Sequence, residues 1–190
     1  MKIAISILCA ILLCSCAAGQ KSANILAGIA TAYGIHEAGH EIASRITSTP
    51  INWDSMEYTI KPKDRASGAI ICASGLVAQQ ISSEVVIRAG WKNDYTDGMM
   101  IWNTINPIAY SLGYWFSFGT NYEPNGGGFH GDISGIEYYS NDNTAHIFAI
   151  AMVGLSSLNA YRYWLSDKEP MGVWFLPVRG GAGLVYSKRF

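Results

Sequence analysis

The sequence His36-Glu37-Ala38-Gly39-His40 (HEAGH) lies in an apolar run that extends from Ala23 to Ile46. When this run is wound into a helix, nearly its whole circumference is small or apolar, which predicts a long helix that is buried on most sides. Asn24 or Ser22 can cap the start of this helix. Thr47-Ser48-Thr49-Pro50 is expected to end it, because the residue before a proline avoids the helical conformation.

The two histidines of the motif are four residues apart, a spacing that places them on one face of a helix. His36 and His40 can therefore present their imidazoles to one metal ion, with Glu37 beside them. Neutral imidazoles suit Zn²⁺, and a neighbouring carboxylate can take a proton from the attacking water as general base. The pattern predicts a hydrolytic zinc site. The alternative is a buried helix whose histidines are satisfied by hydrogen bonds in the core.

The HEAGH helix resembles the metal helix of HExxH zinc metallopeptidases, the zincins, and is loosely similar to that of membrane enzymes of the site-2-protease type. The segment Gly75-Leu76-Val77-Ala78-Gln79-Gln80 is also similar to the small-residue stretch that follows this helix in membrane zinc proteases. The resemblance implies a membrane-associated zinc metalloendopeptidase, with Zn²⁺ as cofactor and a protein or peptide as substrate. The chain departs from the site-2 type because its candidate downstream ligand, Asp132, is followed by Ile133 and not by the glycine of that family's Asp-Gly pair.

The resemblance also implies a third zinc ligand further along the chain. In membrane zinc proteases this ligand is an Asp far downstream of the motif, and Asp132 is the best positional equivalent. In the thermolysin-like group it is a Glu on a following helix, which would make Glu84 the ligand instead. We expect Asp132 to be the third ligand and keep Glu84 as the alternative, although Glu84 also suits an ordinary solvated helix position.

Three consecutive glycines, residues 126–128, precede His130 and Asp132. A glycine-rich loop can bring polar groups to a defined place, because glycine adopts backbone conformations that other residues avoid. We therefore expect His130 to act beside Glu37 in catalysis, either as a ligand or as a hydrogen-bond donor to an oxyanion. The alternative is a glycine-rich turn that carries a surface histidine and a surface aspartate.

The N-terminus has the pattern of a secretory signal. Met1-Lys2 precedes the apolar run from Ile3 to Leu13, and the sequence then continues as Cys14-Ser15-Cys16. Leu13 to Cys16 resembles a bacterial lipobox, which implies that residues 1–15 are a signal peptide and that Cys16 carries the lipid anchor. The alternative is an uncleaved first membrane helix, for which the run is short of the ~20 residues needed to span a bilayer.

Composition points toward a membrane and away from nucleic acid. The 190 residues carry a net charge of −1, and the 13 Lys and Arg are scattered without a basic run. Nearly half of the residues are hydrophobic and only 14% are charged. A stretch between Asp97 and Glu123 has no charged residue and is long enough to cross a bilayer, although Pro107 also suits a kinked core helix.

The whole pattern predicts a mainly α fold, a compact bundle of about four hydrophobic helices in one domain over residues 16–190. A second long helix is expected from Ala66 to Gly90, and another from Asn143 to Leu165 with Asn143 or Thr144 as its cap. Alternation in Ile51 to Pro62 indicates a short strand segment. Two strand-like arms joined by Gly180-Gly181 indicate a C-terminal β-hairpin.

These expectations combine into a zinc-dependent peptidase of the bacterial cell envelope, associated with membrane lipid through a lipid anchor or through its own helices. The alternative is a non-catalytic envelope lipoprotein that acts as a scaffold or partner-binding bundle. Glu37 separates the two, because a hydrolase needs a carboxylate beside the metal and a structural zinc site does not.

Overall fold

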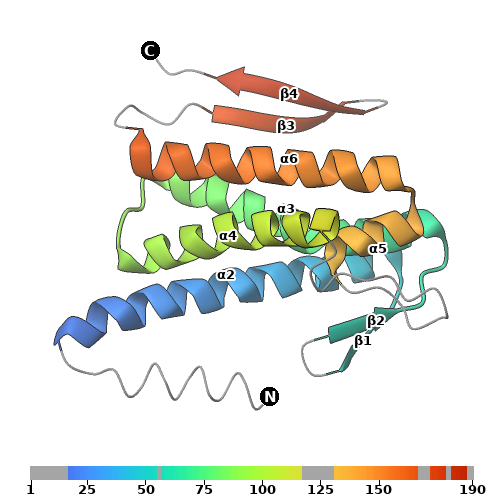
Figure 1. The fold of residues 1–190 in the computed structure, drawn as a ribbon, viewed down its shortest axis with the longest axis horizontal. Helices are drawn as coiled ribbons and strands as arrows, with labels where there is room; N and C mark the ends of the chain where they lie inside the picture. The colour runs from blue at the N-terminus through green and yellow to red at the C-terminus, as the bar shows by residue number, and fades with distance from the viewer. Residues whose placement is uncertain (1–16, 55–56, 117–130, 167–171, 179–180, 188–190) are drawn as a thin grey trace.

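The protein is mainly α-helical. The computed structural model describes residues 17–54, 57–116, 131–166, 172–178 and 181–187 (Figure 1). Five α-helices form most of this part of the chain: α2 (Ala17–Thr47), α3 (Arg65–Ala89), α4 (Asp94–Phe116), α5 (Asp132–Tyr139) and α6 (Asp142–Ala160), which continues into a π-helical turn, η1 (Tyr161–Leu165).

The predicted long helices are present, with differences at their starts. Helix α2 begins before both predicted caps, Ser22 and Asn24, because Ala17 and Ala18 are strong helix formers that extend it. Helix α6 is capped by Asn141, whose side chain accepts a hydrogen bond from the Thr144 backbone N–H at 2.9 Å, and not by Asn143 or Thr144 themselves.

Helix α3 has clear signals at both ends. The Asp64 side chain caps its start by accepting a hydrogen bond from the Ser67 N–H at 2.7 Å. Its end is closed by Gly90, whose φ of 66° is the left-handed conformation that favours glycine. The predicted bounds of this helix, residues 66–90, are thus confirmed to within one residue.

The charge-free stretch forms most of α4, with Pro107 inside the helix. Proline has no N–H, so it leaves the carbonyl of residue 103 without its usual helical partner. The Asn103 carbonyl instead accepts a hydrogen bond from Gln80 of α3 at 3.5 Å. The proline therefore contributes a contact between α3 and α4.

The helices pack as a bundle in which α4 lies between α2 and α6, and α3 contacts α2 and α5 (Figure 1). Two clusters of buried apolar side chains hold it together. One joins α3 to α5 and α6 through Cys72, Leu76, Ile133, Ile136, Ala145, Ala149 and Met152. The other joins α2, α3 and α4 to η1 through Ala32, Val86, Ile87, Met99, Met100 and Tyr163.

A short antiparallel hairpin follows α2. Its strands, β1 (Ile51–Asp54) and β2 (Glu57–Ile60), pair from Ile51↔Ile60 to Asp54↔Glu57. This hairpin, near residues 51–60, is the short strand segment that was predicted between Ile51 and Pro62. Further along, the backbones of β3 (Gly172–Val178) and β4 (Gly181–Ser187) pair with each other, also antiparallel.

Two helical segments are long and apolar enough to cross a membrane, residues 65–89 of α3 and residues 142–165 of α6 with η1. Core helices of soluble proteins meet the same criterion, so this finding alone is weak support for a membrane location. Helix α4, which contains the charge-free stretch, is not one of the two.

Candidate metal centre

Three side chains from two helices meet in the interior of the bundle. His36 and His40 lie one turn apart on α2, and Asp132 is the first residue of α5. All three are buried, with exposed fractions of 3%, 0% and 3%. The structure thus brings together the two histidines and the aspartate that the sequence suggested as ligands, and this buried group could hold a metal ion.

The distances between the potential ligand atoms suit a small cation. The Nε2 atoms of His36 and His40 are 3.1 Å apart. The Asp132 carboxylate oxygens lie 3.1 Å from His36 Nε2 and 3.4 Å from His40 Nε2. Tetrahedral zinc with bonds of about 2.0–2.1 Å would separate its ligand atoms by about 3.3 Å. The side chains are therefore already at metal-ligand spacing.

Hydrogen bonds on the far side of each imidazole fix which nitrogen faces the centre. His40 Nδ1 donates to the Ile71 carbonyl oxygen at 2.7 Å. His36 Nδ1 donates to Gln79 Oε1 at 3.1 Å, and this oxygen also accepts from Asn106 Nδ2 at 3.0 Å. In the neutral imidazoles, both Nε2 lone pairs consequently point toward each other and toward the carboxylate.

This arrangement requires a positive charge at its centre, because lone pairs and a carboxylate at these distances repel one another. Burial by itself would lower the pKa of His40, but the charge and hydrogen bond of Asp132 raise that pKa overall. Burial by itself would raise the pKa of Asp132, but the charge of His40 and the hydrogen bonds from both histidines hold that pKa well below its usual range. A proton on His40 or a metal ion can supply the charge.

Tyrosines surround the group. Tyr58 of β2 donates a hydrogen bond to Asp132 Oδ1 at 3.3 Å, and its ring centre lies 4.7 Å from that of His40. Burial, followed by the charge of Asp132, raises the pKa of Tyr58 well above its usual range, so Tyr58 stays a donor. The Tyr110 ring of α4 stacks on His36 at 5.9 Å. These contacts hold the aspartate and the imidazoles in place.

Glu37 lies beside the group without belonging to it. Its side chain is half-buried. Burial, together with the charge of Glu37 and its hydrogen bond, raises the pKa of Tyr33 to about 12, and the Glu37 charge also acts on His40 and Tyr110.

Asp132 reaches the centre through a backbone conformation that depends on glycine. Gly131, directly before it, has φ 89° and ψ 151°. This region is essentially restricted to glycine, since a Cβ would collide with the backbone. The three consecutive glycines of the predicted loop, residues 126–128, lie outside the described residues. His130 lies outside the described residues, and its proposed catalytic role stays a prediction.

The other predicted residues lie elsewhere. Glu84, the alternative third ligand, forms ion pairs with Arg88 and Arg162 and is not part of the group. His146 of α6, which is not one of the predicted residues, is also outside the group: it lies 3.1 Å from Asp142 and accepts a hydrogen bond from Trp115 Nε1. Cys16, the predicted lipidation site, lies outside the described residues.

Tyr58 and Gln79, which contact the group, and Asn106, which donates to Gln79, were not singled out from the sequence. A signal existed for Gln79, because it lies one turn after Gly75 in an otherwise apolar stretch of helix, where an amide needs a partner. The contacts of Tyr58 and Asn106 cross between elements that are distant in sequence, and no local pattern reveals them.

Comparison with known proteins gives no match, whether with protein-family models, with curated proteins or with solved structures. The interpretation of this centre accordingly depends on its own geometry.

Gly75 allows α3 to approach the two histidines. A Cβ at this position would lie 2.4 Å from His40 Nε2 and 2.7 Å from His36 Cε1. We expect Gly75→Ala to push these imidazoles apart, to reduce zinc binding and to destabilise the fold by about 1–3 kcal/mol. Zinc titration and urea unfolding measure the two effects.

Gly34→Ala is the matched control, because nothing lies within 4 Å of a Cβ at Gly34 of α2. This change should leave zinc binding intact and stabilise the helix by about 0.5–1 kcal/mol. Equal zinc affinity in the two variants would show that close approach of α3 is not needed by the centre.

Gln79 orients His36 through the hydrogen bond to Nδ1. Gln79→Met keeps a similar shape but removes the acceptor, so His36 can turn or change tautomer. We expect zinc affinity to fall about 10–100-fold, as is usual when a partner of a metal ligand is lost. Competition with a chromophoric chelator measures the affinity, and Gln20→Met, at an exposed position of α2, is the control. If Gln79→Met bound zinc as tightly as the unaltered chain, Gln79 would contribute to packing only and not to the orientation of His36.

Proposed function

We propose that this chain is a zinc-dependent peptidase that acts at or in a bacterial membrane. The observation that carries the proposal is the buried His36, His40 and Asp132 group, whose potential ligand atoms lie within 4.8 Å of one another. Two histidines and one carboxylate are a donor set of catalytic zinc sites, which have three protein ligands and keep a fourth position open. Zinc is therefore the metal that we assign to the group.

The residues have separate roles in this proposal. His36, His40 and Asp132 would hold the ion, and bound zinc would supply Lewis acidity toward a peptide carbonyl. Glu37 would accept the proton of the attacking water and pass it to the leaving amine. The charge of Glu37 acts on both His40 and Tyr110, which supports a position of the carboxylate close to the centre. Tyr58 would orient Asp132.

A membrane location is supported by the apolar surface of two helices. Ile70, Ile81 and Val85 of α3 are more than half exposed, as are Ile147 and Ile150 of α6. These helices are also the two that meet the length and hydropathy criterion for a membrane span. Scattered apolar residues are common on soluble proteins, but several on adjacent helices favour contact with lipid. The signal peptide over residues 1–15 and the lipid anchor at Cys16 belong to the same proposal.

Reversible metal removal tests the function. The full chain, purified in detergent, is incubated with a mixture of peptides, and the products are identified by mass spectrometry. We expect cleavage that a chelator abolishes and that stoichiometric zinc restores, because three protein ligands release the ion to a strong competitor. Binding of zinc without cleavage of any peptide would favour a structural metal site, and failure to bind zinc would remove the basis of the proposal.

A further inference from the structure

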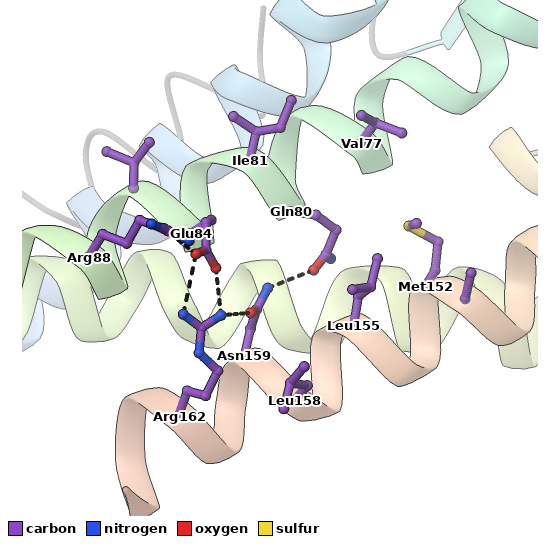
Figure 2. Close-up of a pocket in the computed structure, with 12 residues that line it drawn as sticks. Val77, Gln80, Ile81, Glu84, Arg88, Met152, Leu155, Leu158, Asn159 and Arg162 are labelled. Atoms are coloured by element: carbon purple, nitrogen blue, oxygen red, sulfur yellow. Dashed lines mark hydrogen bonds and ion pairs between the residues drawn. The ribbon is translucent and has the colours of Figure 1, made fainter. Parts of the chain in front are cut away.

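A cavity of about 490 Å³ lies between α3 and α6, apart from the candidate metal centre (Figure 2). None of the residues that line it belongs to the His36, His40 and Asp132 group. Its volume is within the range of about 300–1,000 Å³ that is typical of small-molecule sites. Most of its wall is aliphatic, formed by Val77, Ile81 and Val85 of α3 and by Ala151, Leu155 and Leu158 of α6.

One end of the cavity is polar. The Arg162 side chain, only 2% exposed, donates from Nη1 to Glu84 Oε2 at 2.5 Å and from Nη2 to Glu84 Oε1 at 3.3 Å. Asn159 joins the network by accepting from Arg162 Nη1 at 3.2 Å and by donating to Gln80 Oε1 at 3.1 Å. Figure 2 shows this network, with Arg88 on the other side of Glu84.

One hydrogen-bond donor of Arg162 has no partner in this network. Arg162 lines the cavity, and its Nε is buried and has no hydrogen-bond acceptor among the described residues. A buried donor without an acceptor is unfavourable, so a ligand oxygen placed there would be stabilised. The ionisable residues of the wall are two arginines and one glutamate, which favours an oxygen that carries negative charge.

The mouth of the cavity is apolar and faces outward. Three of its wall residues, Val77, Ile81 and Val85, have exposed fractions of 39%, 60% and 52%. From Val77 to Arg88 the wall follows α3 for about 16 Å, since a helix rises 1.5 Å per residue. A slender apolar chain with a polar end fits this shape: the chain along the aliphatic wall and the polar end at Arg162.

We propose that this cavity binds one acyl chain of an anionic amphiphile, with an oxygen of its head group accepting a hydrogen bond from Arg162 Nε. A free fatty acid and an anionic phospholipid share this chemistry. The site is independent of the metal and goes beyond the peptidase proposal. It would give the protein specific lipid recognition in addition to general contact with a membrane.

Binding is tested on the full chain in a fixed concentration of nonionic detergent, with 11-(dansylamino)undecanoate as the fluorescent probe. We expect saturable binding that laurate displaces and methyl laurate does not. Phosphatidylcholine vesicles with and without phosphatidylglycerol then distinguish the two natural sources. Displacement of the probe by laurate and also by the vesicles that contain phosphatidylglycerol, but not by vesicles of phosphatidylcholine alone, identifies an anionic phospholipid as a ligand. Displacement by laurate but by neither kind of vesicle identifies a fatty acid.

Two variants locate the site. Arg162→Lys keeps the positive charge beside Glu84 but removes the Nε donor, and should weaken probe binding about tenfold, equivalent to one good hydrogen bond. Ala151→Trp fills the cavity from an exposed position of α6 and should abolish binding even if Arg162→Lys does not fold. Arg45→Lys, in an exposed pair with Glu41, and Ser157→Trp, at an exposed position of α6 outside the cavity wall, are the matched controls.

Three results would overturn the proposal. They are the absence of saturable probe binding by the unaltered chain, equal displacement by methyl laurate and laurate, and unchanged binding by Ala151→Trp.

Discussion

Asp132→Asn is expected to purify with almost no zinc, whereas the unaltered chain should retain about one zinc per chain after dialysis against a weak chelator. The substitution keeps the size of the side chain and an oxygen that can accept from Tyr58. It removes the negative charge that lies 3.1 Å and 3.4 Å from the two imidazole Nε2 atoms. The loss of zinc affinity should exceed the roughly 100-fold loss that is the most expected when a hydrogen-bond partner of a ligand is changed. Elemental analysis of detergent-purified protein provides the measurement.

The control for this experiment is Asp142→Asn. Asp142 also stands at the start of a helix, α6, but its side chain is 64% exposed and does not belong to the buried group. His36→Ala and His146→Ala form a second matched pair, one histidine inside the group and one outside. If Asp132→Asn kept its zinc while Glu84→Gln lost it, the third ligand would be Glu84 and the geometry of the buried group would have another purpose.

The two histidines could be predicted from the sequence because their relation is local. A helix fixes the relative position of residues four apart, and the apolar run around HEAGH predicts that helix without knowledge of the rest of the chain. The same holds for α3, whose start at Asp64 and end at Gly90 follow from side-chain and backbone preferences of single residues. Local periodicity therefore accounts for the helices and for two members of the group.

Asp132 was predicted with an alternative because its distance from His36 is not local. In sequence, Glu84 and Asp132 were both suitable carboxylates on later segments. Tertiary packing determines which of the two lies near the histidines. Helix α5 packs on α3, and its first residue, Asp132, contacts His36 of α2. Glu84 lies farther along α3 and pairs with Arg162. Arg162 is 78 residues away from Glu84, so no local sequence pattern indicates that pairing.

The hydrogen-bond partners of the imidazoles are the least predictable part. Ile71 contributes a backbone carbonyl, for which side-chain identity is uninformative, and Tyr58 reaches Asp132 from a hairpin whose position depends on the end of α2. The short strand segment itself was recognised by its alternation, but its contact with the centre was not. Such partners are set by tertiary packing, and they determine which imidazole nitrogens face the ion.

Glu37→Gln is expected to keep its zinc and to lose peptide hydrolysis by about 10²–10⁴-fold, the usual contribution of a general base. Gln has nearly the same shape as Glu, but it cannot take a proton from water. Zinc content and initial rates on the same preparation measure the two effects.

Glu41→Gln is the control for Glu37→Gln, because Glu41 lies one turn further along α2 in a surface pair with Arg45 and should be dispensable for both properties. Full activity in Glu37→Gln would place the base elsewhere, with His130 as the next candidate. Loss of zinc in Glu37→Gln would instead make Glu37 a ligand, which its position outside the buried group argues against. Retained zinc with lost hydrolysis is the combination that separates a catalytic centre from a structural one, since a structural site has no use for a carboxylate at position 37.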